Sequence, residues 1–563
     1  MNDPGTHAQP MLGVRLQARD VALALMLAVF SYACAWLWIT TTPAGVPPDE
    51  YGHLTYIHEI AAEGRIVPDY AGSRRLPHRT RPNYLNHPPL YYTTMGLAGR
   101  VMGWDAIADV RAYRALSAGF VALGIMLWIL SGRIAGLSPV ALIAVTAALH
   151  AIPMFPYLAG SINNDNLAFL GVAIAFHGLL RLRRGAGPPM AYYIAALGVA
   201  IAMLTKATAA LFLCACFAAW ALPQLRDPSA PIRSRHFVRA LLIAGVAVGG
   251  YYGWAVATHG TVFPVATEIY SELTPPRDPL GLLPFAATFA KAMTARLATV
   301  MSFGPLYPIT PGLRPLFYLM LALPLVAWLA QLRPGSPHPQ RDVAWSFMLG
   351  LLTTIVVHVW VTWSGYREHG LFAGIQPRYY SYALPGLFIF AFLQLDTNRG
   401  ARLAFGGFAL MATILVALMP PLTLRAESVR AATAEVKGGQ GGTLRVAPPA
   451  SSVLTLQADL SPAGAGHVDR LRLSGGRLVA SGWAIDRADR SPAPGVLILL
   501  GDRIIGRTTT GQARPDVARS LRTRAATASG FSVVVDDVPT GTQACDMRFA
   551  AEQGDGSFAL LRT

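Results

Sequence analysis

Charged residues are scarce in this chain: Asp, Glu, Lys and Arg make up 13% of its 563 residues, whereas 53% are hydrophobic. Soluble globular proteins carry roughly 25% charged residues, so this shortage excludes a single water-soluble domain. The charges are also uneven in sign, with 46 Lys and Arg against 30 Asp and Glu. In a membrane protein a basic excess usually lies in cytoplasmic loops and sets orientation, so it does not indicate a nucleic-acid partner.

Cysteine and the common catalytic motifs are also nearly absent. Of the four cysteines, Cys34, Cys214 and Cys216 lie inside apolar runs and Cys545 stands alone, so neither disulfides nor a cysteine metal site are expected. No HExxH, paired CxxC, Walker loop or nucleophile elbow occurs in a suitable context. The N-terminal residues lack the features of a signal peptide, so the first apolar run is predicted to be a retained membrane anchor.

Long apolar runs, in contrast, are abundant. A membrane-spanning helix needs about 20 apolar residues. On this measure, spans are predicted near residues 20–40, 114–132, 138–157, 166–182, 240–258, 313–332, 343–363, 379–396 and 402–420. The run 190–222 is too long for one crossing and carries Lys206 at its middle, so two short helices are predicted there. The expected fold is a polytopic α-helical membrane protein with about 11 transmembrane helices.

The arginines predict the orientation of these helices. With residues 1–19 in the cytoplasm, a series of arginines falls on the cytoplasmic side, as the positive-inside rule requires: Arg133, Arg181, Arg183, Arg184, Arg226, Arg233, Arg235, Arg239, Arg333, Arg341, Arg399 and Arg402. Residues 20–420 then form a transmembrane domain whose first outer loop is 41–113. A cluster of arginines in that loop suits either an anionic lipid or sugar phosphate, or a solvated loop on lipid headgroups: Arg65, Arg74, Arg75, Arg79 and Arg81.

The composition changes after Pro421, where Gly, Thr, Ser and Asp become frequent. Stretches such as "RLVASGWAID" and "GFSVVVDDV" alternate apolar and polar residues, which is typical of antiparallel strands. We therefore expect a linker over residues 421–445 and an extracytoplasmic β-sandwich domain over 446–563. Trp483 in this domain could stack on a sugar, or it could belong to the core of an alternating strand.

Two adjacent acids follow the first apolar run. The stretch "GVPPDEYGHL" places Asp49 and Glu50 directly after two prolines, which restrain the backbone. A carboxylate at the membrane–water boundary stays hydrated enough to ionise, and it can take a proton from an attacking hydroxyl as a general base. The alternative is that Asp49 caps a helix beginning near Tyr51, because Asp is a favoured N-cap residue.

Two histidines and a tyrosine belong to the same predicted loop. His53 closely follows Asp49, and the stretch "NHPPLYY" contains His87 and Tyr91. A helix beginning near Pro89 could lie along the membrane surface with its aromatic side chains at headgroup level. His87 is a candidate for binding substrate or a metal, whereas interfacial anchoring is the simpler role for Tyr91.

Further polar residues interrupt the apolar runs. Asn164 and Asp165 in "SINNDNLAF" could bind sugar hydroxyls or a divalent cation, or cap a helix. Lys206 is costly inside an apolar stretch unless it is paired or faces a polar cavity, so it is a candidate phosphate ligand, with snorkelling to the interface as the alternative. Arg378 in "QPRYYSYALPG" could bind phosphate through two parallel hydrogen bonds.

Five stretches, in this order, resemble the DUF2142 family of bacterial membrane proteins, within the wider GT-C glycosyltransferase superfamily: "PPDEYGHLTYIHEIAAEGRIVPDY", "YLNHPPLYY", "SINNDNLAF", "LTKAT" and "QPRYYSYALPG". The resemblance covers residues 20–420. It implies a GT-C-like fold and transfer of a sugar from a polyprenyl-phosphate carrier outside the cytoplasm. The family usually has Gly before the arginine of the last motif, where this chain has Pro377.

Carried over by position, the resemblance implies that Asp49 is the catalytic base, with its neighbour Glu50 as the second catalytic residue. Lys206 and Arg378 would bind the donor phosphate. The remaining residues of the motifs would bind substrate: His53, His87, Tyr91, Asn164 and Asp165. A divalent cation is left open as a cofactor, because several of these residues could approach one another only in the fold.

The function expected from the resemblance is an inverting membrane glycosyltransferase in the inner membrane of a bacterium. Its partners would be a polyprenyl-phosphate sugar donor, a cell-surface glycan or glycolipid acceptor and membrane lipids, and its active site and C-terminal domain would be periplasmic. The alternative is a non-catalytic glycan-binding membrane protein or a transporter of lipid-linked glycans. A transporter predicts ionisable residues at the bilayer midplane and related halves of the chain, and the sequence has no repeat of this kind.

Overall fold

The structure is a computed structural model of the chain, and it divides into two compact units, Met1–Arg430 and Ala431–Thr563. The described residues are 16–42, 47, 49–64, 87–105, 108–183, 189–228, 230–262, 279–297, 300–301, 305–306, 311–330, 340–369, 374–393, 399–418, 440–446, 454–459, 466–474, 477–486, 490–500, 503–521, 523–535, 538, 547–553 and 558–561. The arginine cluster predicted in the first outer loop lies outside them. Each unit is described by itself.

The first unit is helical. In its first half the helices are α1 (Ala18–Thr41), α2 (Glu50–Glu63), α3 (Leu90–Met102), α4 (Val110–Ala135), α5 (Pro139–Ala151), α6 (Met154–Ala159), α7 (Asp165–Arg183), α8 (Met190–Met203) and α9 (Ala207–Ala221). Two 3₁₀ turns, η1 (Leu222–Arg226) and η2 (Pro231–Arg233), then precede α10 (Arg235–His259) and α11 (Leu282–Leu297). The remainder comprises the short strands β1 (Val300–Met301) and β2 (Pro305–Leu306), η4 (Pro311–Leu313), α12 (Arg314–Ala330), α13 (Arg341–His369), η5 (Pro377–Ala383), α14 (Leu384–Phe392) and α15 (Arg399–Leu418).

Several of these helices suit a membrane. Among the described residues, six helical stretches are long and apolar enough to cross a bilayer: Ala18–Thr41, Val110–Ala135, Asp165–Leu182, Ala207–Arg226, Arg235–His259 and Arg341–Glu368. The shorter helices α5, α8, α12 and α15 are also apolar. Large apolar side chains of α10, such as Leu242 and Val246, are exposed, as expected for a surface that faces lipid. The chain is therefore a polytopic helical membrane protein, and the number of about 11 crossings remains a prediction.

The predicted spans correspond to helices, with two local differences. The predicted break at Lys206 is present between α8 and α9. The span 138–157, expected as one helix, is interrupted after Ala151, next to Pro153, and continues as the short helix α6. The span 379–396 begins as the 3₁₀ turn η5 because Pro377 and Pro385 each remove a backbone N–H donor.

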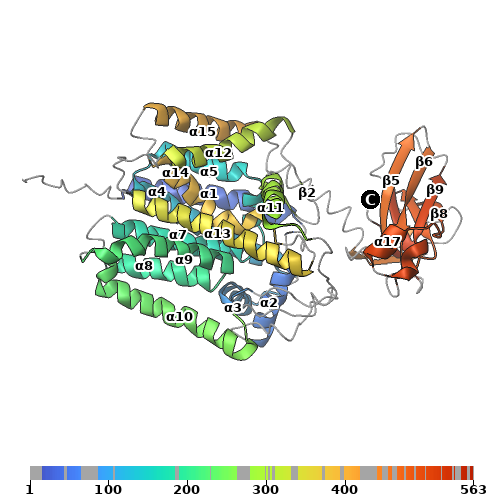
Figure 1. Ribbon diagram of the computed structural model, residues 1–563, viewed down its shortest axis with the longest axis horizontal. Helices are drawn as coiled ribbons and strands as arrows, with labels where there is room; N and C mark the ends of the chain where they lie inside the picture. Colours follow the sequence, from blue (N-terminus) through green and yellow to red (C-terminus); the bar gives the residue numbers. More distant parts are fainter. Residues whose placement is uncertain are drawn as a thin grey trace, which may run out of the picture. The chain divides into compact units, whose positions relative to one another are not determined.

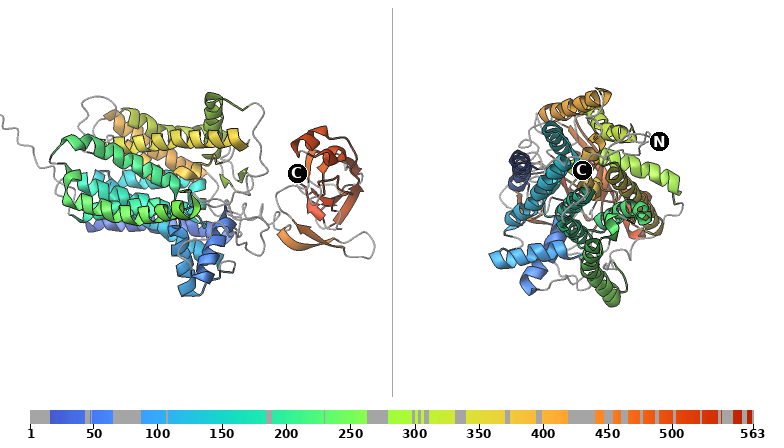
Figure 2. Two further views of the ribbon diagram at one scale, coloured as in Figure 1. Left: turned by 60° about the horizontal axis from the view of Figure 1, so that its bottom comes forward. Right: turned by 90° about the vertical axis from the view of Figure 1, so that its left-hand side faces the viewer.

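The long helices lie side by side, and the short helices α2, α3 and α11 lie across one end of them (Figure 1). A second view gives the same arrangement (Figure 2). We call this end of the helical unit the site end.

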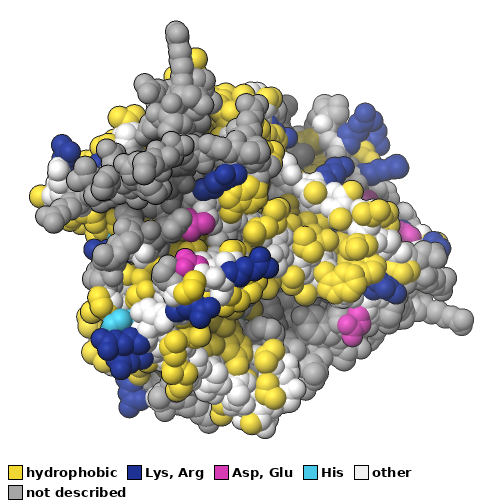
Figure 3. Space-filling model, turned by 60° about the vertical axis from the view of Figure 1, so that its left-hand side comes forward, with side chains coloured by type: hydrophobic (Ala, Val, Ile, Leu, Met, Phe, Trp, Pro, Cys, Tyr) yellow, Lys and Arg dark blue, Asp and Glu magenta, His cyan; other side chains and the backbone are white. Residues whose placement is uncertain are grey.

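Helix α11 falls in a stretch that was expected to be a loop, and its Phe285 and Phe289 pack in a small cluster with Tyr366 of α13. Basic side chains are more frequent than acidic ones on the face of the molecule shown in Figure 3, between broad areas of hydrophobic side chains.

Helices α7 and α8 pack with their backbones unusually close. A Cβ atom on Gly178 would come within 2.5 Å of the Ala195 amide nitrogen, and one on Gly198 within 2.2 Å of the Ala175 amide nitrogen. Only glycine permits such an approach. The two helices run antiparallel, so this glycine seam brings the start of α7, at Asp165, beside the end of α8, near Lys206.

The second unit contains two sheets whose strands are mostly antiparallel. Its elements are β3 (Gln440–Val446), β4 (Leu454–Asp459), β5 (Gly466–Ser474), β6 (Arg477–Ala484), β7 (Val496–Leu500), β8 (Arg503–Thr508), α17 (Pro515–Ser520), η6 (Arg524–Ala528), β9 (Gly530–Val535), β10 (Met547–Glu552) and β11 (Phe558–Leu560). One sheet has the order β3-β4-β11-β10-β7-β8 and the other β5-β6-β9. The sheets share one apolar core, as a sandwich does, with Leu478 and Phe531 from one sheet and Ile498 and Phe549 from the other.

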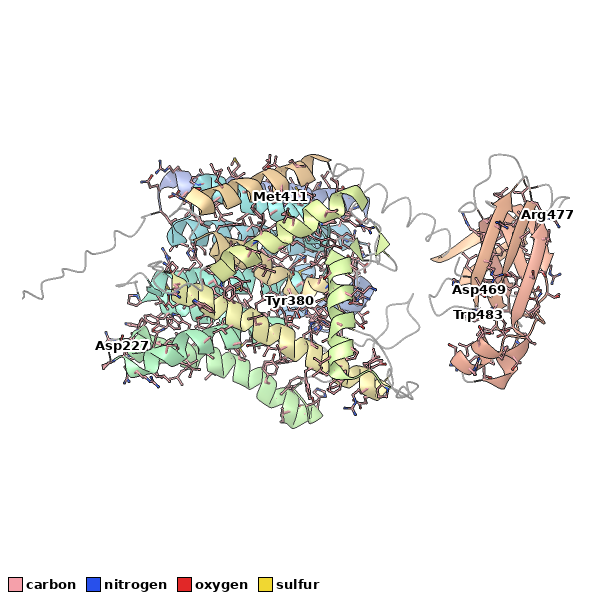
Figure 4. The ribbon with its side chains drawn as sticks, turned by 45° about the horizontal axis from the view of Figure 1, so that its top comes forward. Asp227, Tyr380, Met411, Asp469, Arg477 and Trp483 are labelled. Atoms are coloured by element: carbon pink, nitrogen blue, oxygen red, sulfur yellow. The ribbon has the colours of Figure 1, made fainter. Side chains whose placement is uncertain are left out.

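Two details of this unit bear on the predictions. Strand β3 begins at Gln440, inside the segment expected to be a linker, and residues 421–439 of that segment lie outside the described residues. Trp483 is partly buried and packs against Ile485, Val517 and Ala526 (Figure 4). Its packing favours a core role for this tryptophan over sugar stacking.

Candidate functional site

Asp49 stands immediately before α2, but its side chain does not cap that helix. The residue has φ of 60°, in the left-handed region that a non-glycine residue enters at a cost, and it makes no side-chain cap hydrogen bond. Instead its Oδ2 accepts a hydrogen bond from Nη2 of Arg378 in η5 at 2.5 Å. The side chain of Asp49 is 27% exposed and that of Arg378 is 6% exposed. The acid therefore keeps access to solvent while the arginine lies behind it.

Glu50 is the first residue of α2, and it faces the opposite way. Its Oε1 accepts from Nε of Arg114 at 2.8 Å, and its Oε2 accepts from Nη2 of the same guanidinium at 2.7 Å. The Glu50 side chain is fully buried. A carboxylate that is fully enclosed and bound on both oxygens cannot reach a substrate, so this geometry does not support the predicted catalytic role of Glu50.

Lys206 lies in the break between α8 and α9. Its Nζ is 2.6 Å from Oδ1 of Asp165, and the side chains of both residues are almost fully buried. Asn164 lies beside them: its Oδ1 is 3.4 Å from Lys206 Nζ, and its Nδ2 donates to the carbonyl of Thr205 at 3.0 Å. The lysine is therefore paired inside the protein, and it does not snorkel to the interface.

The ring of Tyr379 brings the two ion pairs together. Lys206 Nζ lies 4.8 Å from the centre of this ring, and Cζ of Arg378 lies 5.5 Å from it. Burial opposes the charge of Arg378, but Asp49, Tyr379 and Asp165 more than compensate, so the pKa of Arg378 is raised. Two cations and two acids thus meet around one aromatic ring, and each acid offsets the repulsion between the cations.

His53 and His87 lie next to these charges. Their rings stack with centroids 6.0 Å apart, and Nδ1 of His53 is 3.0 Å from the hydroxyl of Tyr92. Burial and His87 hold the pKa of His53 well below its usual value. Burial and the charge of Lys206 lower the pKa of His87 to about 3. Both imidazoles are therefore neutral at neutral pH, and each can both donate and accept a hydrogen bond.

Tyr91 is fully buried, and its ring packs edge-on against the ring of His53. Its hydroxyl is 3.0 Å from Ser117 Oγ, which also accepts from Nδ2 of Asn166 at 2.9 Å. Asn166 Nδ2 additionally lies within hydrogen-bond distance of the carbonyl of Ser161. Tyr91 therefore supports the turn that carries Asn164 and Asp165, and it does not line an open surface.

The structure thus brings the predicted residues to the site end from five separate parts of the chain: α2, α3, the start of α7, the break between α8 and α9, and η5. Among the described residues there is no group of three His, Cys, Asp or Glu side chains that could hold a metal ion. A divalent cation remains an untested prediction. Three histidines within the apolar helices bond to protein atoms: His150 to Thr146, His177 to Ser131, and His358 to Tyr380 and Gly374.

Two residues of the site were missed in the sequence. Arg114 holds Glu50, and the only signal for it was an arginine at the start of an apolar run, which usually requires a partner. Tyr379 lies between the two cations and follows Arg378 directly. Nothing in the local sequence distinguishes Tyr379 from its neighbours Tyr380 and Tyr382.

Figure 4 shows Tyr380 among the helices and Asp227 at the end of the unit away from α2 and α3.

No family model matches the sequence, and no curated protein matches it. The resemblance to DUF2142 therefore rests on its motifs alone. Among solved structures, the chain is similar to ArnT from Cupriavidus metallidurans bound to undecaprenyl phosphate, with 16% identity and a TM-score of 0.37 over 75% of this chain and 81% of that one. The apo state of ArnT gives 15% identity and the same TM-score over 75% and 80% of the two chains.

A third similar structure is the oligosaccharyltransferase of Archaeoglobus fulgidus tethered with an acceptor peptide, with 12% identity and a TM-score of 0.34. The match covers 72% of this chain and 55% of that one. Similarity at this level says nothing about activity. The proposal that follows therefore rests on the residues of the site.

Proposed function

We propose that this protein is a membrane glycosyltransferase that transfers a sugar from a polyprenyl-phosphate-linked donor to a cell-surface glycan or glycolipid. The observation that carries the proposal is the group of two cations and two acids around Tyr379, at one end of a set of apolar helices. A lipid-linked phosphate sugar combines an apolar chain, an anionic phosphate and a polar sugar. The site offers a matching group for each part.

Lys206 and Arg378 bind the phosphate. A guanidinium can give a phosphate two parallel hydrogen bonds, and the ammonium supplies a compact positive charge. Lys206 also stands at the N-terminus of α9, where the helix dipole favours an anion. The incoming phosphate competes with Asp49 for Arg378 and with Asp165 for Lys206, so donor binding releases an oxygen of Asp49 for chemistry.

The reaction is a single displacement with inversion. Asp49 takes the proton of an acceptor hydroxyl while the hydroxyl oxygen forms a bond to the anomeric carbon. The bond between that carbon and the phosphate oxygen breaks, and its electron pair stays on the leaving polyprenyl phosphate. Lys206 and Arg378 stabilise the negative charge that develops there. Asn164 and the neutral His53 and His87 bind the hydroxyls of sugar or acceptor.

We place the site on the periplasmic side of a bacterial inner membrane, because the predicted cytoplasmic arginines belong to the other ends of the helices. The C-terminal unit would then lie in the same compartment as the acceptor. The competing functions are non-catalytic glycan binding and transport of lipid-linked glycans. The test below distinguishes them from sugar transfer.

The test compares purified wild type, Asp49→Asn and Asp105→Asn in nanodiscs with a panel of radiolabelled polyprenyl-phosphate sugars. Asp105 is an exposed acid between α3 and α4, and it serves as the matched control. We expect wild type and Asp105→Asn to release sugar from the carrier. Asp49→Asn should still bind donor but turn it over about 10²–10⁴-fold more slowly, the usual contribution of a general base.

Binding is measured on the same samples by retention of labelled donor. Equal turnover by wild type and Asp49→Asn would remove Asp49 as the base. If wild type binds every donor in the panel but releases sugar from none of them, the transferase proposal is wrong and glycan binding or transport takes its place. Movement of intact donor across liposomes would then distinguish those two.

A further inference from the structure

Two acid–arginine pairs connect helix α4 to its neighbours, one near each end of α4. At the end away from the site, Nε of Arg133 in α4 donates to Oδ1 of Asp20 in α1 at 2.8 Å. At the site end, Arg114 of α4 pairs with Glu50 at 2.7 Å. The two arginines are about 28 Å apart along α4, at 1.5 Å per residue. Helix α4 therefore carries one pair with an acid of α2 beside the candidate site and a second pair with an acid of α1 remote from it.

Arg114 joins three backbone segments. Its Nε and Nη2 bind the two oxygens of Glu50, and its Nη1 donates to the carbonyls of Thr42 at 2.5 Å and Ile39 at 3.5 Å. These carbonyls belong to the last turn of α1, where helix carbonyls lack partners inside the helix. One guanidinium thus fixes the end of α1 to the start of α2.

Glu50 extends this connection to the turn before α7. Its Oε1 accepts a hydrogen bond from the backbone N–H of Ile162 at 3.3 Å. Ile162 begins the turn that carries Asn164 and Asp165, and Glu50 directly follows Asp49 in the chain. The pair therefore contacts the backbone next to both acids of the site, the one proposed as base and the one that holds Lys206.

We infer that Glu50 and Arg114 form a positioning pair, which sets the separation between the Asp49 carboxylate and the phosphate-binding residues without touching donor or acceptor. This inference rests on the proposed function. Asp49 is held in a left-handed conformation, and such a conformation persists only where its surroundings enforce it. The bidentate bond on the next residue supplies that constraint. A shift of about 1 Å in a reacting group can cost 10²-fold in rate.

A buried ion pair could instead contribute only to folding, and the remote pair separates the two roles. The experiment uses Glu50→Gln and Arg114→Lys at the site end, with Asp20→Asn and Arg133→Lys as controls at the other end of α4. Full-length proteins in nanodiscs are compared for Tm, donor Kd and single-turnover rate. We expect the site-end variants to lose about 10–100-fold in rate with donor Kd nearly unchanged. The control variants should lose Tm but keep the rate of the folded protein.

Hydrogen–deuterium exchange gives a readout that does not need turnover. We expect Arg114→Lys, but not Arg133→Lys, to accelerate exchange of the amides that follow Asp49 in the first turns of α2. Absence of donor turnover in wild type would contradict the proposed function and leave this exchange measurement as the test of the pair. The positioning role would be wrong if the variants of both pairs changed the rate per folded molecule equally. It would also be wrong if Arg114→Lys and Arg133→Lys gave equal exchange in α2.

Discussion

Each unit of the molecule contains an arginine–aspartate pair of the same length in very different surroundings. Arg378 and Asp49 approach to 2.5 Å in the helical unit, and Arg514 and Asp469 approach to 2.5 Å in the C-terminal unit. Arg378 is 6% exposed, whereas Arg514 is 21% exposed and also binds Asp516, which is 57% exposed. Distance alone therefore does not define a functional site.

The difference lies in what surrounds each pair. Arg378 shares a buried site with Lys206 and Asp165. Burial, together with the positive charges of Lys206 and Arg378, lowers the pKa of the neighbouring His87. Hydrogen bonding to Arg514 lowers the pKa of Asp516 to about 2, but water screens that pair. The first pair differs from the second because it is buried together with several other titratable groups. We expect three measurements to test this contrast.

The largest effect is expected from Asp165→Asn. Removing this acid leaves Lys206 charged and without its buried partner, which typically costs about 3–5 kcal/mol of folding free energy. The measurement is thermal unfolding with and without polyprenyl phosphate. Added polyprenyl phosphate should raise the Tm of the variant more than that of wild type, because its phosphate replaces the missing charge. An equal rise in both would show that the phosphate does not bind Lys206.

The next effect concerns the acid sensitivity of His87. Its pKa is about 3 in the folded protein, below the ordinary value of 6.5, so the unfolded chain binds a proton that the native protein does not. Stability is full above pH 6.5 and falls as the pH is lowered toward 3. At pH 5 this loss amounts to about 2 kcal/mol, and we expect His87→Gln to remove it. Tm measured from pH 7 to pH 5 checks this, and parallel curves for variant and wild type would contradict it.

The smallest effect is expected from Asp469→Asn in the C-terminal unit. Exposed ion pairs contribute about 0–1 kcal/mol, because water and salt screen them. Thermal unfolding of the full-length protein, alongside Asp165→Asn, measures the contrast directly. A loss for Asp469→Asn as large as that for Asp165→Asn would refute the argument from burial. Sugar transfer by Asp469→Asn should equal that of wild type.

Much of the helical architecture could be predicted because apolar runs of membrane length have few alternative structures. The break at Lys206 was also predictable, since a lysine rarely lies within a continuous apolar helix. Helix α11 was missed because it is too short and too mixed in composition to meet a membrane criterion, and it packs on α13 through two phenylalanines. The shift to η5 depended on two prolines whose effect on a helix start is local.

The partners within the site could not be predicted in the same way. Asp49 and Arg378 are 329 residues apart in the chain, and no local pattern joins them. Local rules offered helix capping as an alternative role for Asp49, but its side chain makes no cap hydrogen bond and binds Arg378 instead. The two adjacent acids looked equivalent in sequence. Their roles separated only through Arg114, which encloses Glu50 and leaves Asp49 accessible.

The glycine seam between α7 and α8 has a consequence for inheritance. Asp165 begins α7 and Lys206 follows α8, so the sliding of one helix on the other would move the two residues of this ion pair past each other. Gly178 and Gly198 prevent that sliding by direct contact of backbones, although neither touches the site. We expect an inherited change of either glycine to a larger residue to force the two backbones apart and so to disturb a pair of charges that the glycine itself does not touch.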